Sequence, residues 1–184
     1  MSLILASQSP RRRELLEKLN IPFVVRVADV DETMDTAIPL EDAVAQLSRR
    51  KAEAVAREEQ DIVIAADTIV VLDDQVLGKP RDEADAFRML KSLSGRSHRV
   101  MTGVTVLQGE TVRCHTEVTE VFFRELTEEE IWAYIRTKDP MDKAGSYGIQ
   151  SGATVFVEKI HGDYFNVVGL PVCRLALILK EFGV

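Results

Sequence analysis

Three consecutive arginines at the start of the first predicted helix are the residues of this chain best suited to bind an anion. They follow a short apolar run (residues 3–6) and a hydroxyl-rich loop, Ser7-Gln8-Ser9-Pro10. Ser9 suits the N-cap and Pro10 the first helical position. Because a helix N-terminus carries partial positive charge, cations there are unfavourable unless an anion completes the site. The hydroxyls, the free N–H groups and the guanidinium groups of Arg11 and Arg12 therefore favour a phosphate site, although a solvated basic face after a plain cap fits the same residues.

Asp67 and Lys51 are candidates for chemistry at a bound phosphate. Asp67 and its neighbour Thr68 follow the apolar run 62–66, and the end of a buried strand is a frequent position for a catalytic carboxylate. The same pair could instead begin a turn. Lys51 lies on the apolar stripe of a predicted helix, four residues after Leu47. Its ammonium group must therefore reach solvent along its own stem, or find a phosphate or a carboxylate inside.

Two further positions extend this set. Glu32 follows another predicted strand (residues 23–27), and two converging carboxylates, Glu32 and Asp67, are what a protein commonly offers to Mg²⁺. Lys79 lies in the loop Gly78-Lys79-Pro80, where the following proline restricts it to extended backbone.

Length, composition and charge limit the class of protein. The 184 residues include 46% hydrophobic and 29% charged side chains, which is typical of a globular protein with a substantial core. This length predicts one domain over residues 1–184, or two small lobes that share a cleft. The formal net charge is −7, whereas nucleic-acid-binding proteins are usually basic, so we expect no nucleic-acid partner. Any anion site must therefore be a local concentration of positive charge.

Cysteine, histidine and hydropathy patterns argue against disulfides, structural zinc and membranes. Cys114 and Cys173 are far apart in sequence, which favours a reduced, cytoplasmic chain. His98, His115 and His161 have no zinc-type spacing; His98 could add charge to a basic loop or simply lie at its surface. The start does not have the pattern of a signal peptide, and no apolar run approaches the roughly 20 residues of a membrane helix. We expect a cytoplasmic protein without a membrane partner.

Helices and strands are mixed along the chain without an internal repeat. Helices are expected over residues 10–19, 39–58, 82–93, 127–134 and 171–182. Strands are expected over residues 3–6, 23–27, 62–66 with a continuation over 69–72, 76–77, 100–107, 112–123, 155–160 and 166–168, and a glycine-rich loop over 139–152. The runs 100–107 and 112–123 should form a hairpin near Gly109, and Thr127 with Glu130 a capping box. A hairpin within an α/β pattern predicts mixed sheet topology.

One motif points to different chemistry. Asp29-Val30-Asp31-Glu32-Thr33 after an apolar strand matches the Asp-x-Asp-x-Thr nucleophile loop of haloacid-dehalogenase-type phosphatases. That fold requires a regular parallel βαβ sheet, whereas the second half of this chain is rich in predicted hairpins. A phosphatase with Asp29 as its nucleophile is the alternative that this motif leaves open.

Six motifs occur in order along nearly the whole chain. They are Ser7-x-Ser9-Pro10-Arg11-Arg12-x-Glu14-Leu15-Leu16, Ala66-Asp67-Thr68, Gly78-Lys79-Pro80, Ser94-Gly95-Arg96-x-His98, Asp142-Lys143-Ala144-Gly145-x-Tyr147-Gly148-Ile149-Gln150 and Asn166-Val167-Val168-Gly169-Leu170-Pro171. Together they resemble the Maf family of nucleoside triphosphate pyrophosphatases. The segment 143–150 resembles the branch that acts on dTTP and UTP. Ser151 departs from the pattern, because many members have glycine there.

The resemblance implies an α/β fold of mixed topology, two-lobed with a central cleft and similar to the inosine triphosphatase-like enzymes. It implies hydrolysis of dTTP and UTP to the monophosphate and pyrophosphate with a divalent cation, Mg²⁺ or Mn²⁺, and it makes modified pyrimidine triphosphates further candidates. By matching position, Asp67 is the proton acceptor, Lys51 and Lys79 are further catalytic residues, and Glu32 and Asp67 are metal ligands. The substrate-binding and specificity positions are Arg12, Thr68, Gln150, Ser7 and Arg11.

The chemistry of these residues agrees with the implied roles. Hydrolysis of a triphosphate needs charge neutralisation, a metal ion and an oriented water. The carboxamide of Gln150 offers one donor and one acceptor group, which match N3–H and O4 of uracil or thymine. A flipped amide could accept cytosine, so selectivity cannot rest on Gln150 alone. Maf proteins are also associated with arrest of septum formation, so the alternative is a non-catalytic nucleotide-binding regulator. The sequence leaves open whether the chain forms a homodimer.

Overall fold

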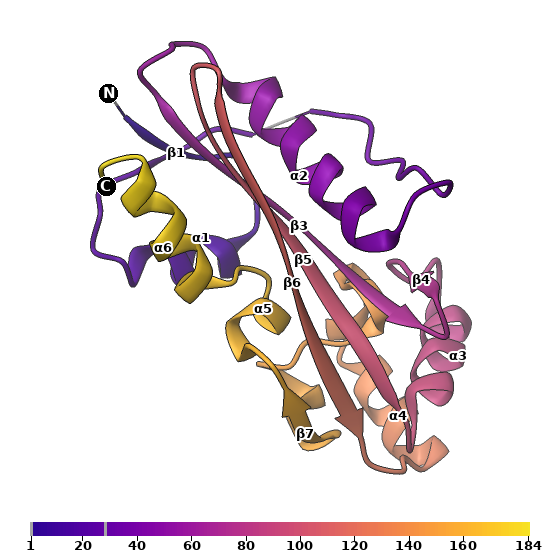
Figure 1. Ribbon diagram of the computed structural model, residues 1–184. Helices are drawn as coiled ribbons and strands as arrows, with labels where there is room; N and C mark the ends of the chain where they lie inside the picture. The colour runs from indigo at the N-terminus through magenta and orange to yellow at the C-terminus, as the bar shows by residue number, and fades with distance from the viewer. Residues whose placement is uncertain (1, 28) are drawn as a thin grey trace. The chain divides into compact units, whose positions relative to one another are not determined.

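The computed structural model describes residues 2–27 and 29–184 and divides the chain into two compact units. Unit 1 contains Met1–Thr68, Thr102–Glu117 and Gly169–Val184, and unit 2 contains Ile69–Met101 and Val118–Val168. Seven strands form a mixed sheet in the order β2-β1-β3-β5-β6-β7, with β4 pairing with β3. The three longest strands are β3 (Ile62–Leu72), β5 (Ser97–Gln108) and β6 (Thr111–Phe123) (Figure 1). Each of them supplies residues to both units.

Unit 1 is built on the parallel part of the sheet. β1 (Leu3–Leu5) pairs in parallel with β2 (Val24–Val25) on one side and with β3 on the other. Its helices are α1 (Pro10–Glu17), α2 (Leu40–Val55) and α6 (Val172–Glu181). Ala52 and Val55 of α2 are buried in one cluster with Val63 and Ala65 of β3. This packing places α2 on the sheet face to which the odd-numbered residues of β3 point.

Gly103 of β5 marks the closest approach of α2 to the sheet. A Cβ atom at this position would lie 2.5 Å from the carbonyl oxygen of Val44. Backbone atoms of the helix therefore occupy the space that any larger residue would need. The position of α2 depends on the absence of this one side chain.

Unit 2 contains two antiparallel strand pairs. β4 (Gln75–Leu77) pairs with β3, and β7 (Val157–His161) pairs with β6. Its helices are α3 (Glu83–Leu93), α4 (Glu128–Arg136) and α5 (Tyr164–Val168), with short 3₁₀ helices η1 (Asp139–Asp142), η2 (Ala144–Ser146) and η3 (Gly152–Val155). Edge-to-face contacts join Phe123 to Tyr147 and to Phe156, and Tyr134 to Phe156. This aromatic cluster packs the irregular segment between α4 and β7 against β6.

Most of the predicted elements are confirmed, and three expectations are corrected. Thr127 and Glu130 form the predicted capping box, and a two-residue turn at Gly109 joins β5 and β6. The expected continuation of the strand 62–66 over residues 69–72 is confirmed, but β3 is unbroken, so Asp67 lies inside the strand and not at its end. Residues 166–168 belong to helix α5 and not to a strand, and the expected loop 139–152 contains the 3₁₀ helices η1 and η2 and the first residue of η3. In the described part of the chain, every helix is too short or too polar to cross a bilayer.

Candidate functional site

The loop before α1 has the capped geometry that its sequence predicts. The Ser9 side chain is the N-cap and accepts a hydrogen bond from the Arg12 backbone N–H, at 3.4 Å, and Pro10 occupies the first helical position. Ser7 Oγ accepts from the Ser9 backbone N–H at 3.1 Å. The first turn of α1 contains no acidic residue. The partial positive charge of this helix end and the charges of Arg11 and Arg12 are therefore not balanced within the turn itself.

Arg12 is oriented by contacts with two other segments of unit 1. Its Nε donates to the carbonyl oxygen of Gly169 at 2.8 Å, and its Nη2 donates to Thr68 Oγ1 at 3.0 Å. Thr68 Oγ1 lies 2.9 Å from Thr102 Oγ1. Gly169 has a φ of 132°, a conformation that favours glycine. The two bonds engage two of the five N–H donors of the guanidinium group, in a fixed orientation.

Asp67 and Thr68 lie in the middle of β3, where a polar pair interrupts the buried run. Side chains alternate across a strand, so these neighbours point to opposite faces of the sheet. Thr68 contacts Arg12, and Asp67 points to the face that α2 covers. The expectation that Asp67 lies at the end of a strand is wrong, because the strand runs through the polar pair without a break into the expected continuation at Ile69. β3 thus contacts α1 through Thr68 and α2 through Asp67.

Lys51 of α2 joins two carboxylates. Its Nζ lies 2.5 Å from Asp67 Oδ1 and 2.8 Å from Glu32 Oε1. The Lys51 and Asp67 side chains are 12% and 16% exposed, whereas Glu32 is 69% exposed, so most of the electrostatic attraction comes from the inner pair. Of the three outcomes that the sequence left open for Lys51, pairing with a carboxylate is the one observed.

The segment that carries Glu32 is held to α2 by a neighbouring contact. Asp31 Oδ1 accepts from the Thr33 backbone N–H at 2.9 Å and from Thr33 Oγ1 at 2.6 Å. These hydrogen bonds, first that of the Thr33 side chain, lower the pKa of Asp31. Arg50, adjacent to Lys51 on the helix, donates from Nη2 to the Thr33 carbonyl oxygen at 2.6 Å. Sequence reasoning missed this role, although Asp-x-Thr spacing is typical of a local side-chain turn.

The sheet topology disagrees with the phosphatase alternative. A mixed sheet with antiparallel β3–β4 and β6–β7 pairs is not the regular parallel sheet that the nucleophile loop requires. Asp31, the second acid of that motif, is engaged in the turn with Thr33.

Electrostatics link Arg12 to the Lys51 cluster. Burial lowers the pKa of the Arg12 guanidinium most, the charge of Asp67 raises it, Arg11 lowers it and Glu32 raises it. The two carboxylates that pair with Lys51 therefore also stabilise the charged form of Arg12. Unit 1 brings together cations and acids in the combination that a charged, polyphosphate-bearing ligand and a divalent cation require.

Two carboxylates are too few for a metal site made of protein ligands alone, but they are enough for Mg²⁺. The described residues contain no group of three or more His, Cys, Asp or Glu side chains placed to hold a metal. Glu32 and Asp67 nevertheless meet at one atom, Lys51 Nζ. Mg²⁺ is usually held by one or two carboxylates together with water and substrate phosphates, so two such ligands are sufficient for it.

Unit 2 contains the other two predicted site residues, Lys79 and Gln150, and both are exposed. Their segments contact each other, because the Gly145 backbone N–H donates to the Gly78 carbonyl oxygen at 3.1 Å. Gly145 has a φ of 68°, and a Cβ there would lie 2.9 Å from Val70 Cγ1. The glycine is thus required both by its backbone conformation and by close packing.

His98 has neither of the roles that the sequence suggested. It is 3% exposed, its Nε2 lies 2.6 Å from the Tyr147 hydroxyl, and its ring packs edge-on against Phe123. Its Nδ1 has no hydrogen-bond partner in the described part of the protein. Burial lowers the pKa of His98 to about 4, so the ring is neutral at neutral pH and contributes no charge to a site.

The predicted site residues are thus distributed between the two units. Ser7, Arg11, Arg12, Glu32, Lys51, Asp67 and Thr68 belong to unit 1, and Lys79 and Gln150 belong to unit 2. Direct contacts join Lys51 to Asp67 and Glu32, and Arg12 to Thr68. The expected cleft shared by two lobes stays a prediction.

Comparison with known proteins agrees with this architecture. The chain matches the family model described as Maf-like protein over residues 2–182. It is 54% identical to a dTTP/UTP pyrophosphatase of Bacillus cytotoxicus over 180 residues, 97% of this chain and 94% of the relative. It is 51% identical to a dTTP/UTP pyrophosphatase of Bacillus cereus, over 99% of this chain and 96% of the relative.

A solved structure of a HAM1 protein from Coxiella burnetii has a similar fold. The TM-score is 0.53 at 17% sequence identity, covering 98% of this chain and 99% of the other. The expected mixed α/β fold is confirmed, and this chain shares it with the HAM1 protein. Since the family model spans nearly the whole chain and close relatives match it end to end, this protein belongs to the Maf family.

Proposed function

We propose that this protein is a nucleoside triphosphate pyrophosphatase that hydrolyses dTTP and UTP to the monophosphate and pyrophosphate. The observation that carries the proposal is the Lys51–Asp67–Glu32 cluster with Arg12 beside it in unit 1. Relatives that are 54% and 51% identical over nearly the whole chain are named for this activity. Modified pyrimidine triphosphates are further candidate substrates.

Each of the site residues has a separate role in this proposal. Asp67 accepts the proton of the attacking water, a role that requires a carboxylate oriented as the Lys51 ammonium orients it. Arg12, fixed by Thr68 and the Gly169 carbonyl oxygen, contacts the anionic substrate, and Ser7 and Arg11 at the helix start extend the binding surface for phosphate oxygens. Lys79 and Gln150 are assigned from their motif positions, as a further cation for phosphate and as the side chain that distinguishes the base.

A divalent cation, Mg²⁺ or Mn²⁺, belongs to the proposal as a cofactor. Glu32 and Asp67 would hold it, and when bound it neutralises charge on the triphosphate. Lys51 already pairs with both carboxylates in the free protein and offsets one of their two negative charges, so it keeps them close together before the cation and the substrate arrive.

The test is a panel of common and modified triphosphates, assayed with and without Mg²⁺ or Mn²⁺ by separate detection of pyrophosphate and inorganic phosphate. We expect pyrophosphate from dTTP and UTP, and none after chelation of the cation. Asp67→Asn should lower kcat about 10²- to 10⁴-fold, the usual contribution of a general base, while nucleotide binding persists.

Asp29→Asn is the matched control, because Asp29 is an exposed acid of the motif that resembles a phosphatase nucleophile loop. It should retain wild-type turnover. Normal pyrophosphate release by Asp67→Asn would refute the assigned base. Thermal stabilisation by nucleotides without any product would instead identify a nucleotide-binding regulator, and inorganic phosphate as the product would identify a monophosphatase.

A further inference from the structure

We propose that Asp139 is a positioning residue for base selection: acting through Tyr134 and Ser151, it fixes the backbone segment 148–151 that carries Gln150. This inference deepens the proposed function and rests on it, because Gln150 is the residue assigned to the base. It also answers a chemical difficulty. A glutamine amide carries both a donor and an acceptor and can match uracil or cytosine, so selectivity also depends on where the backbone places that amide relative to the base.

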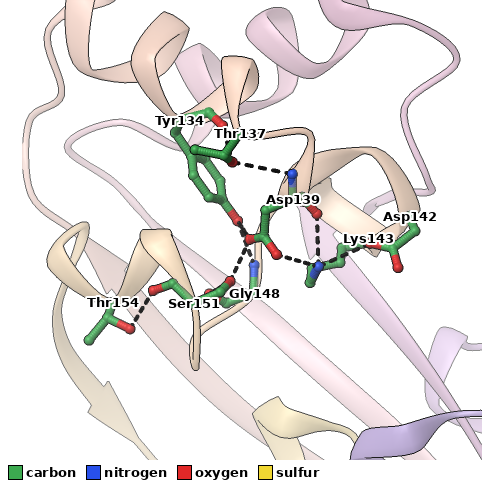
Figure 2. A network of polar contacts seen from close by, with 8 residues as sticks. All are labelled: Tyr134, Thr137, Asp139, Asp142, Lys143, Gly148, Ser151 and Thr154. Atoms are coloured by element: carbon green, nitrogen blue, oxygen red, sulfur yellow. Dashed lines mark hydrogen bonds and ion pairs between the residues drawn. The ribbon is translucent and has the colours of Figure 1, made fainter.

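Asp139 is the centre of a polar cluster in unit 2 (Figure 2). Its Oδ2 accepts hydrogen bonds from the Tyr134 hydroxyl and from Ser151 Oγ, and its Oδ1 lies 2.8 Å from Lys143 Nζ. Lys143 Nζ also donates to the Asp139 carbonyl oxygen at 2.8 Å. The Asp139 and Lys143 side chains are 26% and 11% exposed. The carboxylate is thus held from three directions by groups that solvent only partly reaches.

The cluster contacts the backbone on both sides of Gln150. The Tyr134 hydroxyl, which donates to Asp139, accepts from the Gly148 backbone N–H at 3.1 Å. Ser151 Oγ, bonded to Asp139, also lies 3.0 Å from the Gly148 carbonyl oxygen. Gln150 therefore lies between two residues that are both connected to Asp139, whereas its own side chain is exposed and available to a ligand.

Two glycines allow the segment to pack closely against this cluster. A Cβ at position 148 would lie 2.7 Å from Lys143 Cε and 2.8 Å from Ser151 Oγ, and a Cβ at position 152 would lie 2.8 Å from the Tyr134 ring. Side chains at either position would push the segment away from Tyr134 and Lys143. Hydrogen bonds and close packing thus act on the same few residues.

The charge state of the cluster supports a fixed hydrogen-bond direction. Burial alone would raise the pKa of Asp139, but hydrogen bonds from Lys143, Ser151 and Tyr134 outweigh it and lower the pKa. Burial and the bond to Asp139 raise the pKa of Tyr134. The tyrosine therefore remains protonated and donates to a carboxylate, which leaves its oxygen to accept from Gly148.

Ser151 gives this chain a contact that glycine at the same position cannot make. Its hydroxyl joins the residue after Gln150 directly to the carboxylate. The departure from the family pattern that the sequence showed at this position is thus an additional restraint on the specificity segment.

The experiment compares UTP with CTP in the full-length protein and measures kcat and KM for each by pyrophosphate release. Tyr134→Phe keeps the ring that packs against Phe156 and removes the hydroxyl that joins Asp139 to Gly148. We expect its preference for UTP over CTP, as the ratio of kcat/KM values, to fall about five- to ten-fold, the usual effect of one lost hydrogen bond. The kcat for UTP should change less than two-fold. Tyr164→Phe, at an exposed tyrosine of the same unit, is the matched control and should keep the wild-type ratio.

Two readouts separate positioning from general loosening. In a Gln150→Ala background, Tyr134→Phe should cause no further loss of selectivity, because its effect passes through Gln150. Amide hydrogen exchange at residues 148–151 of the free protein should accelerate in Tyr134→Phe and not in Tyr164→Phe. Additive losses in the double variant, or unchanged selectivity in Tyr134→Phe, would overturn the inference while leaving the proposed function intact. A wild-type protein that releases no pyrophosphate would overturn the proposed function, and the role in base selection with it.

Discussion

Protonation of His98 should destabilise the protein in mild acid, by an amount that follows from its environment. The ring is 3% exposed, and burial lowers its pKa from 6.5 to about 4. A pKa difference of this size is worth roughly 3 kcal/mol, since one pKa unit corresponds to about 1.4 kcal/mol. Between these two values the unfolded chain binds a proton that the folded protein does not. The stabilisation is therefore complete above about pH 6.5 and is lost as the pH falls towards 4.

The measurement is urea unfolding of wild type and His98→Gln at a series of pH values from 7.5 to 4.5. Carboxylates titrate in both proteins, so the prediction concerns the difference between the two pH profiles. The wild type should lose about 2–3 kcal/mol more than the variant over this range. Parallel profiles would refute the reasoning, because they would mean that His98 binds its proton equally well in the folded and unfolded states. Since Nε2 of His98 contacts the Tyr147 hydroxyl, proton uptake should also loosen the segment that leads to Gln150.

Two substitutions in unit 1 test its packing and its charges. Gly103→Ala should destabilise the protein by about 1–3 kcal/mol in thermal or urea unfolding, because the new Cβ meets the carbonyl of Val44 at 2.5 Å, whereas Gly78→Ala, with open space around it, should cost less than about 0.5 kcal/mol. Equal effects of the two would contradict the close approach of α2. Lys51→Met should cost about 1–3 kcal/mol, since it leaves the Asp67 carboxylate without its cation, and a second change, Asp67→Asn, should recover part of this loss. Strictly additive effects in the double variant would show that the pair contributes no coupling.

Local periodicity was sufficient to predict the direction of Lys51 but not its partner. The helical repeat decides which side chains share a face, and Lys51 shares one with Leu47 and Val55, both of which are buried. Which strand residue lies opposite depends on how far α2 sits along the sheet, and Gly103 fixes that position through a contact remote in sequence. The capped start of α1 was predictable because Ser9 and Pro10 act on their own neighbours.

Long-range contacts explain the expectations that were wrong. Val167 and Val168 have strand-forming side chains, yet the Asp163 side chain accepts from the Phe165 backbone N–H and opens a short helix there. Buried Asn166 then donates to the carbonyl oxygen of Val100 and to Thr119 Oγ1, two positions far away in the sequence. The Asp139 cluster was missed for a related reason, because its members follow no helical or strand period. Glycines that only close packing requires, such as those at 148 and 152, leave no distinctive local pattern.

Two adjacent residues of one helix hold the acidic segment of unit 1, and this has a mechanical consequence. Arg50 donates a hydrogen bond to the Thr33 carbonyl oxygen, and Lys51 forms an ion pair with Glu32. The segment 32–33 is thus bound to α2 at two neighbouring points. A small shift of α2 would move Glu32 and Lys51 together. The distance between these two residues would stay the same, while their distance from β3 would change. Substitutions on the apolar side of α2 can thus change the distance between Glu32 and Asp67 without replacing a charged residue.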